Sequence, residues 1–161
     1  MIRPVVIVDP LSSGIELAPT FKARGVPAIA ITLQTEEWPE FGSKLREADF
    51  VEIIPEQPGI EELIRRHDPI AIIPGTEEGI PLAERLTEVL LPHFANDSAK
   101  SIHRSHKSHM QQALFEAGVP TLKTFHTASE HEAETWIEEA GLSSVPLILK
   151  PPCSSGSEMV F

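Results

Sequence analysis

The residues best suited to chemistry lie near the end of the sequence, where an apolar run ends in a lysine and small residues follow. The run is Leu147-Ile148-Leu149, the lysine is Lys150, and the loop contains Ser154, Ser155, Gly156 and Ser157. Small side chains let backbone N–H groups approach phosphate oxygens, serine hydroxyls add donors, and a lysine neutralises charge. The pattern is typical of a phosphate-binding loop and equally of a solvated hairpin turn. A Walker-type loop is excluded because Gly-Lys-Ser/Thr is absent and no helix is predicted after the loop.

The elements that precede this loop begin with an α/β pattern over the first 95 residues. Four short, β-branched and continuous apolar runs predict parallel strands covered on both faces by helices. The strands are expected at residues 5–8, 28–33, 50–54 and 70–73, and the helices at 13–24, 59–67 and 77–91. The third strand is expected at an edge because Glu52 and Pro55 interrupt it. The fold class predicted is α/β, a doubly wound, Rossmann-like parallel sheet.

A second region follows a predicted boundary near residues 92–98. One helix is expected from an N-cap at Ser98 to Ala117, with Gly118 after its last turn. Its inner face would carry Ile102, His106, Met110, Ala113, Leu114 and Ala117. A strand near 121–127, a helix over 130–140 and a buried strand over 146–150 come next. These strands are too few to close a core, so we expect the chain to be a piece of a longer protein.

Three motifs of the second region, in this order, resemble the start of the ATP-grasp domain. They are Arg104-x-x-Lys107-x-x-Met110, then Gly118-Val119-Pro120, then Pro146-Leu147-Ile148-Leu149-Lys150-Pro151 with its serine-rich loop. Leu122 departs from the family, which commonly has a proline there. The first region resembles the pre-ATP-grasp domain of the same family. The resemblance therefore implies a pre-ATP-grasp α/β domain over 1–95 and an incomplete first part of the α+β nucleotide-binding domain over 96–161.

The resemblance also implies site residues and an activity. Lys107 and Lys150 would bind nucleotide phosphates, and Ser154, Ser155, Gly156 and Ser157 would form a lid over the triphosphate. The parent protein would be an ATP- and Mg²⁺-dependent carboxylate–amine ligase that forms an acyl phosphate, most like the L-amino-acid ligases. The family's metal ligands and catalytic arginine would lie beyond Phe161. The 161 residues are therefore expected to hold no catalytic or metal-binding residue and to be inactive alone.

Two turns after predicted strands are weaker candidates for a binding site. The first contains Asp9, Ser12, Ser13 and Gly14, where a helix N-terminus could hold an anion. The second is Thr76-Glu77-Glu78-Gly79, which could orient a substrate amino group. Each is also explained as an ordinary capped turn. If these turns hold a ligand, the alternative function is a stand-alone small-ligand-binding or regulatory module without ATP chemistry.

His103, His106 and His109 invite comparison with a metal site. Successive steps of three residues drift by about 60° around a helix, so the three imidazoles cannot converge well on one ion, although one adjacent pair could. A packed or hydrogen-bonded His106 is the expected outcome.

Composition limits the partners and the compartment. Thirteen basic and 24 acidic residues give a net charge of −11, which argues against nucleic acid. The apolar runs are shorter than a membrane helix needs, and Cys153 is the single cysteine, so a disulfide within the chain is excluded. The expected location is the cytoplasm, and the expected partners are ATP and small carboxylate and amine substrates such as amino acids. Neither nucleic acid nor membrane is expected, and a homodimer is left open.

Overall fold

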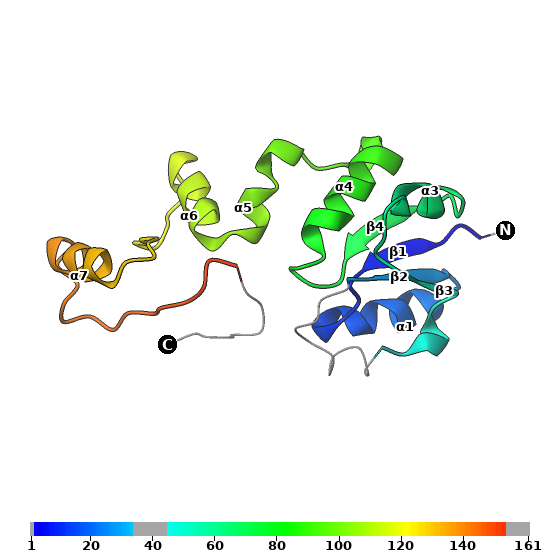
Figure 1. Cartoon of the computed structure of the whole chain (residues 1–161), viewed down its shortest axis with the longest axis horizontal. Helices are drawn as coiled ribbons and strands as arrows, with labels where there is room; N and C mark the ends of the chain where they lie inside the picture. Colours follow the sequence, from blue (N-terminus) through cyan, green and yellow to red (C-terminus); the bar gives the residue numbers. More distant parts are fainter. Residues whose placement is uncertain (1, 34–44, 154–161) are drawn as a thin grey trace. The chain divides into compact units, whose positions relative to one another are not determined.

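The chain forms two compact units, Met1–Ser101 and Ile102–Phe161 (Figure 1). The computed structural model describes residues 2–33 and 45–153. Within those ranges, no helix has the length and apolar character needed to cross a membrane.

The first unit is built on a sheet of four parallel strands. They are β1 (Val5–Val8), β2 (Ala28–Thr32), β3 (Glu52–Pro55) and β4 (Ala71–Pro74), in the order β3-β2-β1-β4. Val6 of β1 lies opposite Ile29 of β2 on one side and Ile72 of β4 on the other. The α/β class, the four strands and the edge position of β3 are confirmed.

Helices cover both faces of this sheet, as the continuous apolar strands require (Figure 1). Helix α1 (Leu17–Lys22), preceded by the 3-10 turn η1 (Ser12–Glu16), packs on one face through Ala18 and Phe21. Helices α3 (Ile60–Arg65) and α4 (Ile80–Leu90) pack on the other face. Three 3-10 turns complete the unit: η2 (Glu47–Asp49), η3 (Pro92–Phe94) and η4 (Ser98–Lys100).

The core of the first unit consists of two apolar clusters, one on each face of the sheet. Val5 and Ile7 point to the α1 face, whereas Val6 and Val8 point to the face of α3 and α4, as the two-residue period of a strand requires. All four are at most 1% exposed. Burial of one such side chain stabilises the fold by about 1.5–3 kcal/mol.

The second unit consists of α5 (Ile102–Ser105), α6 (Lys107–Glu116) and α7 (Glu130–Glu139). The prediction of one helix from 98 to 117 is wrong, because His106 has an extended backbone, with φ −112° and ψ 114°, between α5 and α6. Ser98 is not the cap, since Asp97 accepts the N–H of Ala99 at 3.1 Å. Neither α5 nor α6 contains a buried residue, so the expected inner face does not form. Without packing to keep a helix continuous, local side-chain hydrogen bonds decide where it breaks.

The expected strands at 121–127 and 146–150 are also wrong for this structure. Both segments lie outside the sheet, and the part of the second unit that the structure describes contains no strand. Ile148 and Leu149 are 74% and 69% exposed, so the run before Lys150 is not buried. A strand needs a neighbouring strand for its backbone groups, and apolar sequence alone does not supply one.

Two local predictions for the second unit are confirmed. Gly118 follows α6 with φ +72°, and its N–H donates to the carbonyl of Phe115 at 3.0 Å. Helix α7 covers the predicted range within one residue, and the hydroxyl of Ser129 caps it by accepting the N–H of Glu132 at 3.3 Å. Phe125 stacks on Trp136 of α7, with ring centroids 5.3 Å apart.

A matched pair of truncations tests the difference between the two units. Leu86 is fully buried, so Leu86→Ala is expected to lower the free energy of unfolding of the first unit by about 2–5 kcal/mol. Ile148→Ala is expected to change the stability by less than about 0.5 kcal/mol, because the side chain is exposed. Urea unfolding followed by far-UV circular dichroism measures both. A large loss for Ile148→Ala would show that this segment is packed in solution.

Candidate functional site

The first candidate site lies at the carboxyl edge of the sheet, between β1 and β4. From β1 the chain continues to β2 on one side, whereas β4 pairs with β1 on the other side. Open α/β sheets commonly bind ligands at such a reversal of strand order. The turns are residues 9–14 and 75–79, so both turns singled out from the sequence come together at this edge.

Asp9 and Thr76 join these two turns. The Thr76 hydroxyl donates to Oδ2 of Asp9 at 2.5 Å, and the same hydroxyl accepts the N–H of Gly79 at 3.2 Å. Asp9 is 6% exposed and has a positive φ of 54°. Burial raises the pKa of this carboxyl, the Thr76 hydrogen bond lowers it, and Glu78 raises it. Hydrogen bonds from the Thr76 hydroxyl and from the backbone of Leu33 therefore hold in place a carboxylate that costs energy to bury.

Three glycines allow the two turns to approach each other closely. A Cβ atom on Gly14 would lie 2.6 Å from Cα of Gly75, and one on Gly75 would lie 2.7 Å from Cα of Pro10. A Cβ atom on Gly79 would lie 2.6 Å from the carbonyl oxygen of Val8. These distances are too short for any other residue without movement of the backbone. The sequence identified the two turns as candidate sites. The need for glycine at these three positions follows only from the contact between the two turns.

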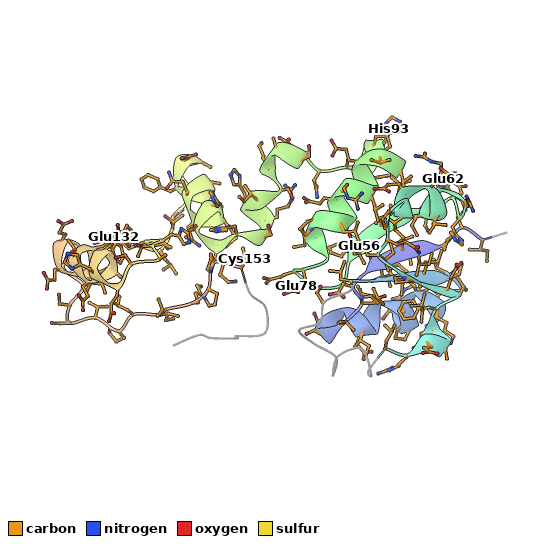
Figure 2. The ribbon with its side chains drawn as sticks, viewed as in Figure 1. Glu56, Glu62, Glu78, His93, Glu132 and Cys153 are labelled. Carbon is orange, nitrogen blue, oxygen red and sulfur yellow. The ribbon has the colours of Figure 1, made fainter. Side chains whose placement is uncertain are left out.

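The charge of this edge favours a cation over an anion. Its two turns carry the carboxylates of Asp9, Glu77 and Glu78, and neither turn contains a basic residue. Figure 2 shows Glu78 on the turn that leads into α4. Helix α1 is only six residues long, which further weakens the case for an anion at residues 9–14. An ammonium group is the ligand that these side chains suit.

The second candidate site lies in the second unit, at the beginning of α6. The backbone N–H of Lys107, the first residue of α6, donates to the carbonyl of Pro152 at 2.9 Å. Figure 2 shows the exposed Cys153, which follows Pro152, beside this end of the helix. Two motifs that are 45 residues apart in the sequence, at Lys107 and Pro152, are thus in direct contact. Sequence spacing alone gave no sign of this hydrogen bond.

The other predicted site residues are only partly placed. Lys150 is exposed, two residues before Pro152, and it does not end a buried strand as expected. Ser154, Ser155, Gly156 and Ser157 lie outside the described residues. The roles of Lys107, Lys150 and this loop in phosphate binding remain predictions.

Three imidazoles surround the same helix end. The ring of His106 lies 4.4 Å from that of His109 and 5.2 Å from that of His126, and both pairs are T-shaped. Nδ1 of His106 lies 2.9 Å from the hydroxyl of Ser108, so the expectation of a hydrogen-bonded His106 is confirmed. Within residues 2–33 and 45–153, no group of three or more His, Cys, Asp or Glu side chains is arranged to hold a metal ion. His126 was not recognised from the sequence, because its contact depends on the path of residues 121–127.

A cavity of about 570 Å³ lies between α6 and the following segment. Its walls include the polar residues Ser108 and Gln111 and the apolar residues Phe115 and Leu122. Oε1 of Gln111 is buried and has no hydrogen-bond partner among the described residues. Apolar and unsatisfied polar groups together are what an incompletely packed core leaves.

Comparison with known proteins gives one informative match. No family model matches the chain. The chain is 31% identical to dapdiamide A synthase of Enterobacter agglomerans over 163 aligned positions, which include 98% of this chain. The chain spans 38% of the length of that relative. The similarity therefore covers both units, and the related protein is a synthase.

The Asp9–Thr76 pair gives a prediction about pH and stability. The raised pKa means that folded Asp9 binds a proton more tightly than unfolded Asp9, so its ionisation makes folding less favourable as the pH rises above about 4. Asp9→Asn keeps a hydrogen-bonding side chain that tolerates positive φ and removes this cost. The variant is expected to gain stability relative to the wild type between pH 4 and pH 7, measured by urea unfolding. A stability difference that does not change with pH would contradict the burial of an ionisable group at this edge.

The hydroxyl of Thr76 is tested separately. Thr76→Val keeps the shape but leaves both Asp9 and the N–H of Gly79 without this partner. The free energy of unfolding at pH 7 is expected to fall by about 1–3 kcal/mol. Thr124→Val is the control, because its hydroxyl donates to Leu122 on an exposed segment. Equal losses for the two variants would show that the Asp9–Thr76 bond contributes nothing particular.

Proposed function

We propose that this chain is the N-terminal part of an ATP-dependent carboxylate–amine ligase of the ATP-grasp kind. The observation that carries the proposal is the hydrogen bond from the N–H of Lys107 to the carbonyl of Pro152. It brings the lysine of the first motif next to the base of the serine-rich loop, which are the two parts expected to hold a triphosphate. The similarity to a synthase across 98% of the chain supports the same proposal.

The charge distribution also supports a polyphosphate ligand near α6. The chain as a whole has a net charge of −11, yet residues 102–115 of the second unit contain two basic residues and no acidic residue. The basic residues are Arg104 and Lys107. Three histidines lie in the same stretch. A locally cationic surface on an acidic protein favours a small anion over a nucleic acid.

The proposed chemistry assigns each group a role in positioning. Lys107 and Lys150 neutralise phosphate oxygens, and the loop 154–157 covers them with N–H and hydroxyl donors. The γ-phosphoryl group passes to a substrate carboxylate and ADP leaves. The amine then attacks the acyl phosphate, an amide bond forms and phosphate leaves. Catalysis of phosphoryl transfer is largely positioning and charge neutralisation, and Mg²⁺ supplies part of that neutralisation.

The metal ligands and the catalytic arginine are proposed to lie in the rest of the parent protein, as the resemblance to the ATP-grasp family implies. The chain spans 38% of the length of its relative. Residues 1–95 are proposed as the pre-ATP-grasp domain and 96–161 as the beginning of the nucleotide-binding domain. The substrates proposed are a small carboxylate and an amine, of which an amino acid is one.

A second candidate function rests on the other site. The two turns at the switch point place the buried carboxylate of Asp9 next to Thr76, with Glu77 and Glu78 on the same turn as Thr76. A stand-alone module that binds a small ammonium compound there would need no ATP. Thermal unfolding separates the two candidates: amines that stabilise the chain while Mg-ATP does not would favour the module.

The two lysines are tested by nucleotide binding to the 161-residue chain. Amide NMR during titration with Mg-ATP is expected to show shifts at Lys107 and Cys153. Lys107→Ala and Lys150→Ala are each expected to raise the Kd roughly tenfold or more, because a hydrogen bond to a charged group contributes about 1.5–3 kcal/mol. Lys123→Ala is the control, since Nζ of Lys123 lies 3.4 Å from the carbonyl of Ala140 near α7. Binding that is unaffected by both test variants would refute the phosphate-binding assignment.

The chain alone is expected to bind nucleotide without turning it over. Phosphoryl transfer without a held Mg²⁺ leaves the charge of the triphosphate uncompensated. Phosphate release from Mg-ATP by the pure chain is therefore expected to stay at the level of a buffer blank, with or without amino acids. Release that depends on Mg²⁺ and on protein concentration would show that these 161 residues contain a complete site.

A further inference from the structure

His106 occupies the residue immediately before α6 and acts as its N-cap. Its backbone is extended, and its carbonyl accepts the N–H of Met110 at 2.9 Å, the first hydrogen bond of the helix. Its ring nitrogen Nδ1 accepts the N–H of His109 at a long 3.5 Å and faces the hydroxyl of Ser108 at 2.9 Å. A side-chain acceptor at this position satisfies a backbone N–H group that has no partner within the helix.

This cap works only while the imidazole is neutral. Nδ1 can accept a hydrogen bond when the proton is on Nε2, but a protonated ring has a donor on both nitrogens. A donor at Nδ1 would face the N–H of His109. A positive charge there would also lie at the positive end of the helix dipole. Protonation therefore removes the acceptor for the N–H of His109, because Nδ1 can then only donate, for example to the hydroxyl oxygen of Ser108.

The groups around His106 add to that repulsion. His109 and Lys107 belong to the same helix, His126 reaches the ring from the segment 121–127, and His103 of α5 stacks on His109 with centroids 6.4 Å apart. Partial burial lowers the pKa of His106, and His109, His126 and Lys107 lower it further. All the groups that act on it are basic. The arrangement favours the neutral ring at the start of α6.

We infer that neutral His106 is a positioning residue, which fixes the start of α6 so that the N–H of Lys107 meets the carbonyl of Pro152 and the lysine faces the nucleotide. The inference rests on the proposed function for its nucleotide, but its structural part concerns only this chain. Acidification releases the cap, and the contact between Lys107 and Pro152 weakens with it. The sign follows from the lowered pKa: the unfolded segment binds the proton more tightly, so stability is complete above about pH 6.5 and is lost as the pH falls below it.

Two substitutions distinguish the effect of losing the N-cap from the effect of protonating the His106 ring. His106→Asn supplies a cap that does not titrate, whereas His106→Ala removes the cap at every pH. His131→Asn is the matched control, because His131 is exposed on α7. None of the three changes Lys107 or Lys150.

The first measurement is amide hydrogen exchange at Lys107 and His109 in the 161-residue chain at pH 7.5 and pH 5.5, corrected for intrinsic exchange. Wild-type protection is expected to fall roughly 3- to 30-fold at the lower pH, the range that loss of a cap produces. His106→Asn should keep its protection, His106→Ala should lack it at both pH values, and His131→Asn should follow the wild type. NMR titration of the His106 ring should show that it protonates at a lower pH than an imidazole in an unstructured peptide. Protection in His106→Asn that falls with pH as in the wild type, or a His106 ring that titrates as in an unstructured peptide, would overturn the inference.

The second measurement is the Kd for Mg-ATP at the same two pH values. Protonation of the ATP phosphates at the lower pH affects the Kd of every variant equally. The wild type is therefore expected to lose more affinity for Mg-ATP on acidification than His106→Asn does. Equal losses would overturn the positioning role. If no variant binds ATP at either pH, the proposed function fails, and the exchange experiment still decides whether His106 fixes the start of α6.

Discussion

The first unit depends on the pairing of β1 with a strand on each side. β1 is fully buried, so each of its backbone N–H and C=O groups needs a partner within the protein. β2 and β4 supply those partners, and the N–H groups of Asp9 and Gly75 extend the pairing beyond the strand ends. The turns that follow β1 and β4 are therefore in contact. This contact requires glycine at residues 14 and 75, and it brings the Thr76 hydroxyl within hydrogen-bonding distance of Asp9.

The described part of the second unit has no buried strand that must pair with neighbours. Its structure depends on interactions between residues close together in the sequence. Its helices have no buried residue, and its apolar run at 146–150 is exposed. Caps and turns then determine where each element begins and ends: His106 for α6, Gly118 after it, and Ser129 for α7. The Lys107–Pro152 hydrogen bond is therefore informative, because it joins residues that are far apart in the sequence.

The two candidate sites differ in charge, and this difference connects them to one proposed activity. The switch-point edge carries Asp9, Glu77 and Glu78 and suits an ammonium group. The start of α6 carries Lys107 beside several imidazoles, and we propose that it binds phosphate. A carboxylate–amine ligase needs both an anionic nucleotide and an amine, so the two surfaces have complementary tasks under the proposed function.

The sequence by itself determined the α/β class, the strands of the first unit, the edge position of β3 and the glycine Gly118 that follows α6. These depend on apolar runs and on turn residues, which act over short distances. The sequence also marked both turns at the switch point and the lysines of the second unit. Only the tertiary structure decided that Thr76 binds Asp9, that Lys107 meets Pro152 and that His126 reaches His106, because each contact joins residues far apart in the chain. The prediction of a strand at 146–150 was wrong because a strand also depends on a partner elsewhere in the chain. An apolar sequence favours a strand, but the strand forms only beside a neighbouring backbone.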